Sequence, residues 1–145
     1  MTEPDFVRLI DYCVKIAKKA LSARATFDPF AAVLVRSGAV LPLNVPMTEE
    51  HPTLQTLLQE YKILLKTTAT RGEVTALALC FDGRVSLEGL SISQVDEIRL
   101  RLESVEHDAI DVVVPYRKGG FWGNQYGKMT AVRRKGTFFP DIGAD

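Results

Sequence analysis

The sequence predicts a single α+β domain, in which two amphipathic helices pack on an antiparallel sheet of about five or six strands. Two segments, residues 2–22 and 51–72, place apolar residues three or four positions apart, which is the helical period. Several shorter segments alternate apolar and polar residues, as half-buried strands do. The length of 145 residues fits one domain spanning 1–145, and no repeat or low-complexity linker divides it.

The composition is that of an ordinary globular protein, with 46% hydrophobic and 25% charged residues. Eighteen acidic residues balance eighteen basic ones, so net charge favours neither nucleic acid nor a membrane surface. The longest apolar runs, such as "FAAVLV", are far shorter than the ~20 residues that a membrane-spanning helix needs. The first residues lack the basic and apolar regions of a signal peptide. We therefore expect a cytoplasmic protein without a membrane partner.

The first helix is expected over residues 2–22, with Thr2 as its cap and Pro4 in its first turn. Its apolar stripe comprises Phe6, Leu9, Ile10, Cys13, Ile16, Ala17, Ala20 and Leu21. Two strands follow, over 30–36 and 39–43, joined by a turn at Ser37 and Gly38, where glycine can adopt positive φ. Pro42 cannot donate a ladder hydrogen bond, which predicts either an edge position or a strand end for this residue.

The second helix is expected within 51–72, with Pro52 in its first turn and Arg71 and Gly72 at its C-terminal end. Its stripe comprises Leu54, Leu57, Leu58, Tyr61, Leu64, Leu65 and Thr68. The next segment, "EVTALALCF", is apolar on both faces of an extended chain, with Val74 on the face of Ala76. A strand covered on both sides lies centrally in a sheet. A turn and a short strand or loop are then expected over 82–91.

Residues 96–116 predict a hairpin whose two strands face one core. The inward residues are Ile98, Leu100 and Leu102 on the first strand, and Ile110, Val112, Val114 and Tyr116 on the second. A short loop around 105–107 sets Leu102 opposite Ile110 and Arg101 opposite Asp111, and avoids the like-charge pair that a longer loop would create at Glu103. We expect the charges of this hairpin to lie in water, so that the Arg101 and Asp111 pair contributes roughly 0 to 1 kcal/mol.

The sequence contains no recognisable catalytic or metal-binding pattern. The two histidines, His51 and His107, have no partners at ligand spacing, and Cys13 and Cys80 fit core positions rather than a ligand cluster or a disulfide. Phosphate-binding loops, dinucleotide fingerprints and serine nucleophile elbows are absent as motifs. We expect no catalytic residue, metal or cofactor, although an enzyme or small-molecule binder with an unrecognised site stays an alternative.

A basic, aromatic and glycine-rich region lies near the C-terminal end. Its glycines predict a loop at about 117–128, and one further strand is possible within 128–139. The candidate interaction residues are Tyr116, Arg117, Lys118, Phe121, Trp122, Tyr126, Arg133 and Arg134. Rings and cations suit self-packing, a homo-oligomer or another protein partner. They also suit single-stranded nucleic acid, but residues 112–145 hold only six basic residues, so this partner is unlikely.

The chain resembles a family of small uncharacterised bacterial proteins, a domain of unknown function. The resemblance rests on "FDPFAAVLVRSGAV", on the alternating strand before Glu103, and on the hydrophobic strand that ends in Pro115, Tyr116 and a basic residue. The order of elements is also similar to profilin-like and roadblock-like folds, which dimerise through helices and sheet edges. We therefore expect a non-catalytic bacterial cytosolic protein that acts through protein contacts as a homo-oligomer, with Trp122→Ala disturbing association more than folding.

Overall fold

The computed structural model describes residues 4–24, 27–45, 53–83, 96–105, 109–119, 123–134, 136 and 138–139. It confirms the predicted α+β class. The elements are α1 (Pro4–Ala23), β1 (Phe30–Val35), β2 (Val40–Leu43), α2 (Leu54–Thr70), β3 (Val74–Asp82), β4 (Glu97–Ser104), β5 (Ala109–Arg117), β6 (Gln125–Tyr126) and β7 (Thr130–Arg134). The sheet has seven strands, slightly more than expected, since both β6 and β7 pair with β5.

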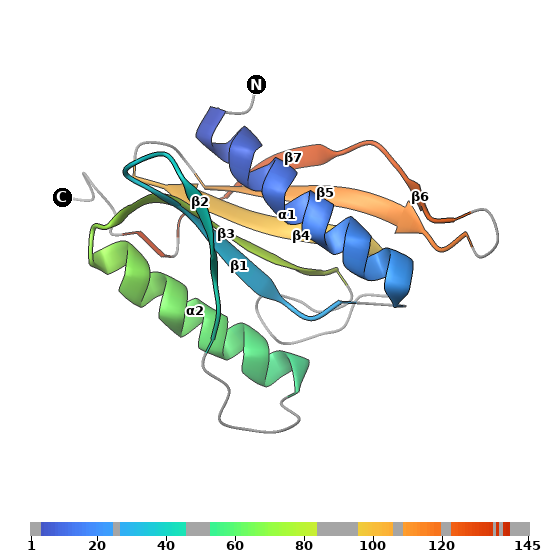
Figure 1. Ribbon diagram of the computed structural model, residues 1–145, viewed down its shortest axis with the longest axis horizontal. Coiled ribbons are helices and arrows are strands. Elements are labelled where there is room, and N and C mark those ends of the chain that lie inside the picture. Colours follow the sequence, from blue (N-terminus) through green and yellow to red (C-terminus); the bar gives the residue numbers. More distant parts are fainter. Residues whose placement is uncertain are drawn as a thin grey trace.

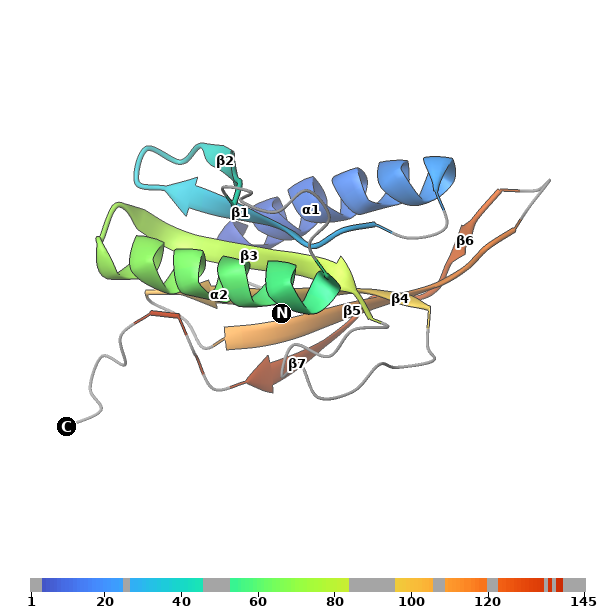
Figure 2. The same ribbon diagram turned by 90° about the horizontal axis from the view of Figure 1, so that it is seen from below.

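The sheet is antiparallel in the order β2-β1-β3-β4-β5, and β6 and β7 lie side by side with different parts of β5. Figure 2 shows this order from β2 at the top to β7 at the bottom, with α2 in front of the sheet. Figure 1 shows the sheet from its β2 edge, with α1 above it and α2 below it. The expected edge position of Pro42 is confirmed, because β2 is the outermost strand on this side.

Two separate cores lie on the two faces of the sheet. The α1 core includes Ala76, Ala78 and Cys80 of β3, and the α2 core includes Leu77 and Leu79. The predicted central position of this strand is therefore confirmed. Val74 was expected on the face of Ala76 but belongs to the α2 core. The pairing of β1 with β3 shifts by one residue between Leu34 and Val35, and this irregularity changes which side of the strand Val74 occupies.

Both helices bury much of the stripes that their periodicity predicts, with differences at particular residues. In α1 the residue Ile16 is 37% exposed and lies at the margin of the stripe. In α2 the helix begins at Leu54, because the Thr53 hydroxyl accepts the backbone N–H of Thr56 at 3.0 Å. Pro52, expected in the first turn, lies outside the described residues, as does Thr2. Arg71 is the C-cap, and Gly72 follows it with a φ of 74°, as predicted.

The hairpin of β4 and β5 has the predicted register. Leu102 pairs with Ile110, and Arg101 pairs with Asp111. The inward-facing residues Ile98, Leu100, Leu102, Val112, Val114 and Tyr116 all belong to the α1 core, with Ile110 packed against it. Residues 106–108 of the connection, including His107, and the segment 84–95 lie outside the described residues.

Two charged side chains on the other face of β4, those of Arg101 and Glu103, do not lie in water, and this corrects the prediction. Arg101 is 5% exposed and Glu103 is 2% exposed. Glu103 Oε1 accepts the backbone N–H groups of Phe138 at 2.8 Å and of Phe139 at 3.4 Å. The Phe138 side chain itself belongs to the α2 core. The second face of the hairpin is therefore partly covered by a segment distant in the sequence.

The segment expected as a loop at 117–128 contains regular structure at both ends. The strand β5 continues to Arg117, and Tyr126 pairs with Tyr116. Between this pair and the pair of Val113 with Thr130, two residues of β5 face three residues of the outer strand, which is the count of a β-bulge. The bulge begins at Gly127, where a Cβ atom would lie 2.9 Å from Pro115 Cγ, so glycine permits the close approach. The further strand is β7.

Candidate functional site

The predicted interaction residues separate into two regions at opposite ends of β5. Tyr116, Arg117, Lys118 and Tyr126 belong to the β5–β6 arm, which we define as residues 115–119 and 123–127. The arm projects beyond the rest of the sheet, to the right in Figures 1 and 2. The other pair, Arg133 and Arg134, lies on β7 opposite Ile110 and Ala109. Phe121 and Trp122 lie outside the described residues.

Tyr116 is part of the α1 core and is 7% exposed. Its hydroxyl donates a hydrogen bond to Asp82 Oδ2 at 3.1 Å, and both side chains are buried. A buried phenol with a satisfied hydroxyl mainly stabilises the fold. Tyr116 therefore connects the arm to the core and presents little surface.

Lys118 and Asn124 satisfy the C-terminal end of α1. The Lys118 ammonium donates to the carbonyl oxygens of Leu21 and Arg24, and Asn124 Nδ2 donates to the same Leu21 carbonyl at 3.0 Å. The last carbonyls of a helix have no partners within the helix, and they carry the negative end of its dipole. Lys118 therefore supplies both hydrogen bonds and positive charge where α1 requires them, and this use occupies its ammonium group.

Tyr126, on the β6 side of the arm, packs between Tyr116 of β5 and Lys18 of α1. Its ring lies 6.3 Å from the Tyr116 ring, centroid to centroid, and the Lys18 ammonium lies 4.4 Å from its centroid. This distance permits a cation–π contact. A shallow hollow of about 440 Å³ between α1 and the arm is lined by Lys18, Leu21, Ser22, Lys118, Gly123, Asn124 and Tyr126. Two of these lining groups, the Asn124 amide and the Lys118 ammonium, already donate hydrogen bonds to carbonyl oxygens at the C-terminal end of α1.

The two arginines of β7 differ in their surroundings. Arg134 Nε donates to Asp111 Oδ2 at 2.8 Å, so its charge is paired. Arg133 is exposed on the opposite face of the strand. The strand β5 has nine residues from Ala109 to Arg117, so the two basic regions at its ends lie roughly 27 Å apart at the usual strand rise.

The described residues hold no group of three or more acidic, histidine or cysteine side chains that could bind a metal ion. Cys13 and Cys80 are both fully buried in the α1 core. Burial raises the pKa of the Cys13 thiol to about 12, and burial, assisted by Cys13 and Asp82, raises the pKa of Cys80 well above its usual value. Both thiols therefore stay protonated near neutral pH, which makes them poor nucleophiles and poor ligands. Neither helix in the described part of the chain combines the length and apolar character needed to cross a bilayer.

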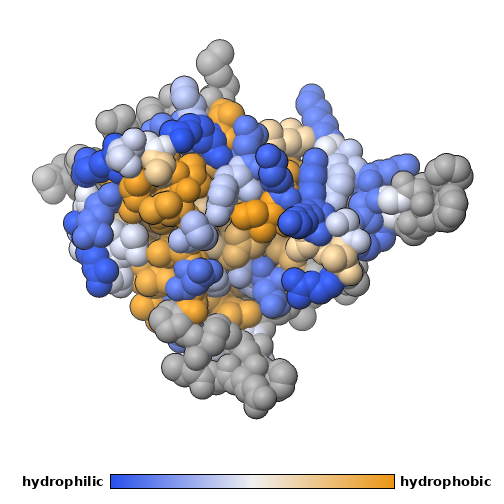
Figure 3. All heavy atoms as spheres, in the orientation of Figure 1, coloured by the Kyte–Doolittle hydropathy of each residue, from blue (hydrophilic) through white to orange (hydrophobic). Residues whose placement is uncertain are grey.

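The β2 edge of the sheet carries an apolar surface that the sequence analysis did not identify. Leu41 is 46% exposed, and Val40 and Leu43 are half-buried. Figure 3, which views the molecule from this edge, shows apolar side chains gathered over β2 and continuing toward the two helices. We call Val40, Leu41, Pro42 and Leu43 the β2 edge surface. A signal was present, since residues 37–48 contain no charged side chain.

A hollow of about 220 Å³, which was not predicted from the sequence, lies at the end of the sheet near the start of α1. Arg8 and Arg36 line it together with Asp5 and Ser104. No motif marks these residues, because they come from α1, the turn after β1 and the end of β4, which only the folded chain brings together.

Comparison with protein-family models, with curated proteins and with solved structures finds no match to this chain. The resemblance to a family of small bacterial proteins therefore stays a prediction.

Proposed function

We propose that this is a non-catalytic bacterial cytosolic protein that acts through protein contacts, and that it forms a homo-oligomer through the β2 edge surface. The observation that carries the proposal is the contrast between the two edges of the sheet. One edge is protected against contact with other chains, and the other is apolar and uncharged.

The outer edge formed by β6 and β7 carries the features by which sheet edges avoid association. It is interrupted by the bulge that begins at Gly127, and the cations Lys128, Arg133 and Arg134 are exposed along it. Bulges and basic side chains both oppose the pairing of edge strands. Apposing this edge in two copies would also bring cations of the same sign together, which costs free energy.

The β2 edge has the opposite character. Its exposed Leu41 is flanked by half-buried Val40 and Leu43, and no charge lies within 37–48. A second copy of the same surface can therefore approach without opposing like charges, and contact removes apolar area from water. Because this segment repels neither sign of charge, its most complementary occupant is an equally uncharged apolar surface, which a second copy provides by symmetry.

Pro42 determines the kind of contact that this edge supports. Proline has no N–H group, and Pro42 pairs with Ala32 within the sheet. A continuous ladder of backbone hydrogen bonds to another strand is therefore interrupted at this residue. We infer that the copies meet mainly through side chains, and such contact restricts the open-ended strand addition that leads to aggregation.

The test is the oligomeric mass of Leu41→Lys, measured by analytical ultracentrifugation over a range of protein concentrations. The wild-type protein should sediment as an oligomer, and Leu41→Lys should shift it to the monomer because the ammonium group cannot be buried in an apolar contact. The matched control is Val132→Lys on β7, where an exposed apolar side chain at the other edge gains the same charge. It should leave the mass unchanged.

A monomeric wild-type protein would refute self-association. An oligomer that Leu41→Lys leaves intact would place the contact elsewhere, and Trp122→Ala would then show whether the segment around residue 122 makes it. Thermal unfolding of each variant separates lost association from lost folding. The nucleic-acid alternative receives little support, since contacts within the protein occupy Lys118 and Arg134.

A further inference from the structure

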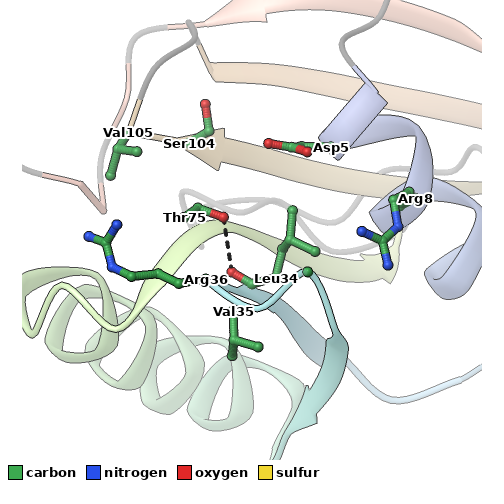
Figure 4. A pocket seen from close by; sticks show the side chains of 9 residues that line it. Asp5, Arg8, Leu34, Val35, Arg36, Thr75, Ser104 and Val105 are labelled. Carbon is green, nitrogen blue, oxygen red and sulfur yellow. Dashed lines mark hydrogen bonds between the residues drawn. The ribbon is translucent and has the colours of Figure 1, made fainter.

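A second feature, independent of the β2 edge surface, is the hollow near the start of α1. Its volume is about 220 Å³, and it is lined by Asp5, Arg8, Leu34, Val35, Arg36, Gly38, Thr75, Ser104 and Val105. Figure 4 shows Arg8 and Arg36 on opposite sides, with Asp5 and Ser104 on a third side. The hollow therefore joins α1, the turn between β1 and β2, the start of β3 and the end of β4.

Arg36 is held in place by a contact that leaves most of its donors available. Its Nε donates to the carbonyl oxygen of Gly72 at 2.8 Å, which connects the turn after β1 to the end of α2. A guanidinium group has five N–H donors, and this contact uses one of them. A fixed guanidinium loses little conformational entropy when it binds a ligand.

Arg8 approaches the same hollow from α1. Its Nη1 lies 3.6 Å from the position of a Cβ atom built on Gly38, which has a φ of 97°. Arg8 is on the second turn of α1, so the positive end of the helix dipole also lies on this side of the hollow. Asp5 contributes the opposing charge. Two guanidinium groups against one carboxylate leave a net positive lining.

The backbone and hydroxyl groups around the hollow are mostly committed to the fold. The Thr75 hydroxyl donates to the Leu34 carbonyl at 3.3 Å, and the Val105 N–H donates to the Thr75 carbonyl at 3.1 Å. Specific recognition of a ligand therefore depends on the two arginines. Their forked donors match the oxygen atoms of phosphate and carboxylate groups.

We propose that this hollow binds a small oxyanion, the phosphate or carboxylate group of a small molecule or inorganic phosphate itself, attracted by the positive charges of Arg8 and Arg36 that line it from opposite sides. Asp5 weakens the binding of such an anion by like-charge repulsion. The site thus has two groups that favour anion binding and one that opposes it, and substitution of each group should change the affinity in a stated direction.

The experiment is a titration of the full chain, labelled with ¹⁵N, by inorganic phosphate and separately by acetate. Ionic strength is kept constant with sodium chloride, and backbone amide shifts are followed. Saturable shifts at Arg36, Gly38 and Val105 are expected. Tighter binding of phosphate would indicate a phosphate ligand, and tighter binding of acetate would indicate a carboxylate ligand.

Three variants test the roles of the lining residues. Arg8→Gln and Arg36→Gln should each raise the dissociation constant several-fold or more, because each removes a positive charge from the lining of the hollow. Asp5→Asn should lower the dissociation constant several-fold, because it removes the opposing negative charge. Arg117→Gln, which removes an exposed arginine on the β5–β6 arm, is the matched control and should bind as the wild type does.

The proposal fails if neither anion gives saturable shifts at millimolar concentration. It also fails if Arg8→Gln and Arg36→Gln bind as the wild type does, or if Asp5→Asn weakens binding. The Asp5→Asn arm keeps the test decisive even if Arg36→Gln destabilises the protein through loss of its contact with Gly72.

Discussion

Arg101 of β4 and Asp111 of β5 lie directly opposite each other and form an ion pair with two hydrogen bonds, from Arg101 Nε to Asp111 Oδ1 and from Arg101 Nη2 to Asp111 Oδ2. The side chains are 6% and 19% exposed, respectively. Arg134 of β7 donates to the same carboxylate from the outer side. One carboxylate thus connects three adjacent strands at a position that is largely removed from water.

Asp111→Ala should lower the free energy of unfolding by about 3 kcal/mol, because it removes the carboxylate that faces the buried Arg101 charge. Arg134→Gln should cost less than about 1 kcal/mol, since the Arg134 side chain is 52% exposed and solvent screens its charge. Urea denaturation of both variants measures the difference. The double variant Arg101→Met with Asp111→Ala should recover part of the loss. Equal effects of Asp111→Ala and Arg134→Gln would contradict the buried character of the inner pair.

Glu103 holds the segment around Phe138 against the sheet through its two backbone hydrogen bonds. Glu103→Gln should destabilise the protein by about 1 to 3 kcal/mol, because the amide is a weaker acceptor and its NH₂ group enters a buried position. Native-state hydrogen exchange should become faster at the Phe138 and Phe139 amides, whereas exchange in the centre of β3 should remain slow.

Phe138→Ala provides the comparison for this contact, because it removes the ring from the α2 core and keeps the Glu103 carboxylate. It should cost about 3 to 5 kcal/mol. Since the two changes release the same segment, the double variant should cost less than the sum of the single variants. Additive costs would show that the carboxylate and the ring act independently.

Cys13 and Cys80 should not react with a thiol reagent in the folded protein at pH 8, and both should react once urea unfolds it. Burial raises the pKa of Cys13 from 9.0 to about 12. Its contribution to stability is thus complete below pH 9 and is lost as pH rises toward 12, because the unfolded chain releases a proton that the folded chain retains.

The free energy of unfolding should therefore fall by about 1.4 kcal/mol per pH unit over this range from Cys13 alone. Cys13→Ala should reduce this slope, and stability measured in urea from pH 8 to pH 11 tests it. Rapid labelling of either thiol in the native protein would show that the α1 core opens more readily than its packing indicates.

The pairing of β4 with β5 shows how far local sequence determines this fold. Alternation assigns Leu102 and Ile110 to one face, and the opposite charges of Arg101 and Asp111 select one register among those that alternation permits. Apolar residues on both faces of β3 likewise indicate a central strand. These predictions succeed because side chains of a strand alternate strictly between faces, whatever lies above them.

The burial of Arg101 and Glu103 was not predictable in the same way. Alternation shows that they share a face but not what covers that face, and the cover includes Phe138, more than thirty residues away. The side on which Val74 lies depends on an irregularity in the adjacent strand pair. The hollow between Arg8 and Arg36 depends on the packing of α1 against the turn after β1.

The sequence by itself determined the fold class, the two helices, the central position of β3 and the register of the hairpin, because each follows from the period of apolar residues within one segment or two adjacent ones. Only the tertiary structure decided which charged groups are buried and which arginines share a hollow. Those properties depend on contacts between segments distant in the chain, and no local period encodes such contacts.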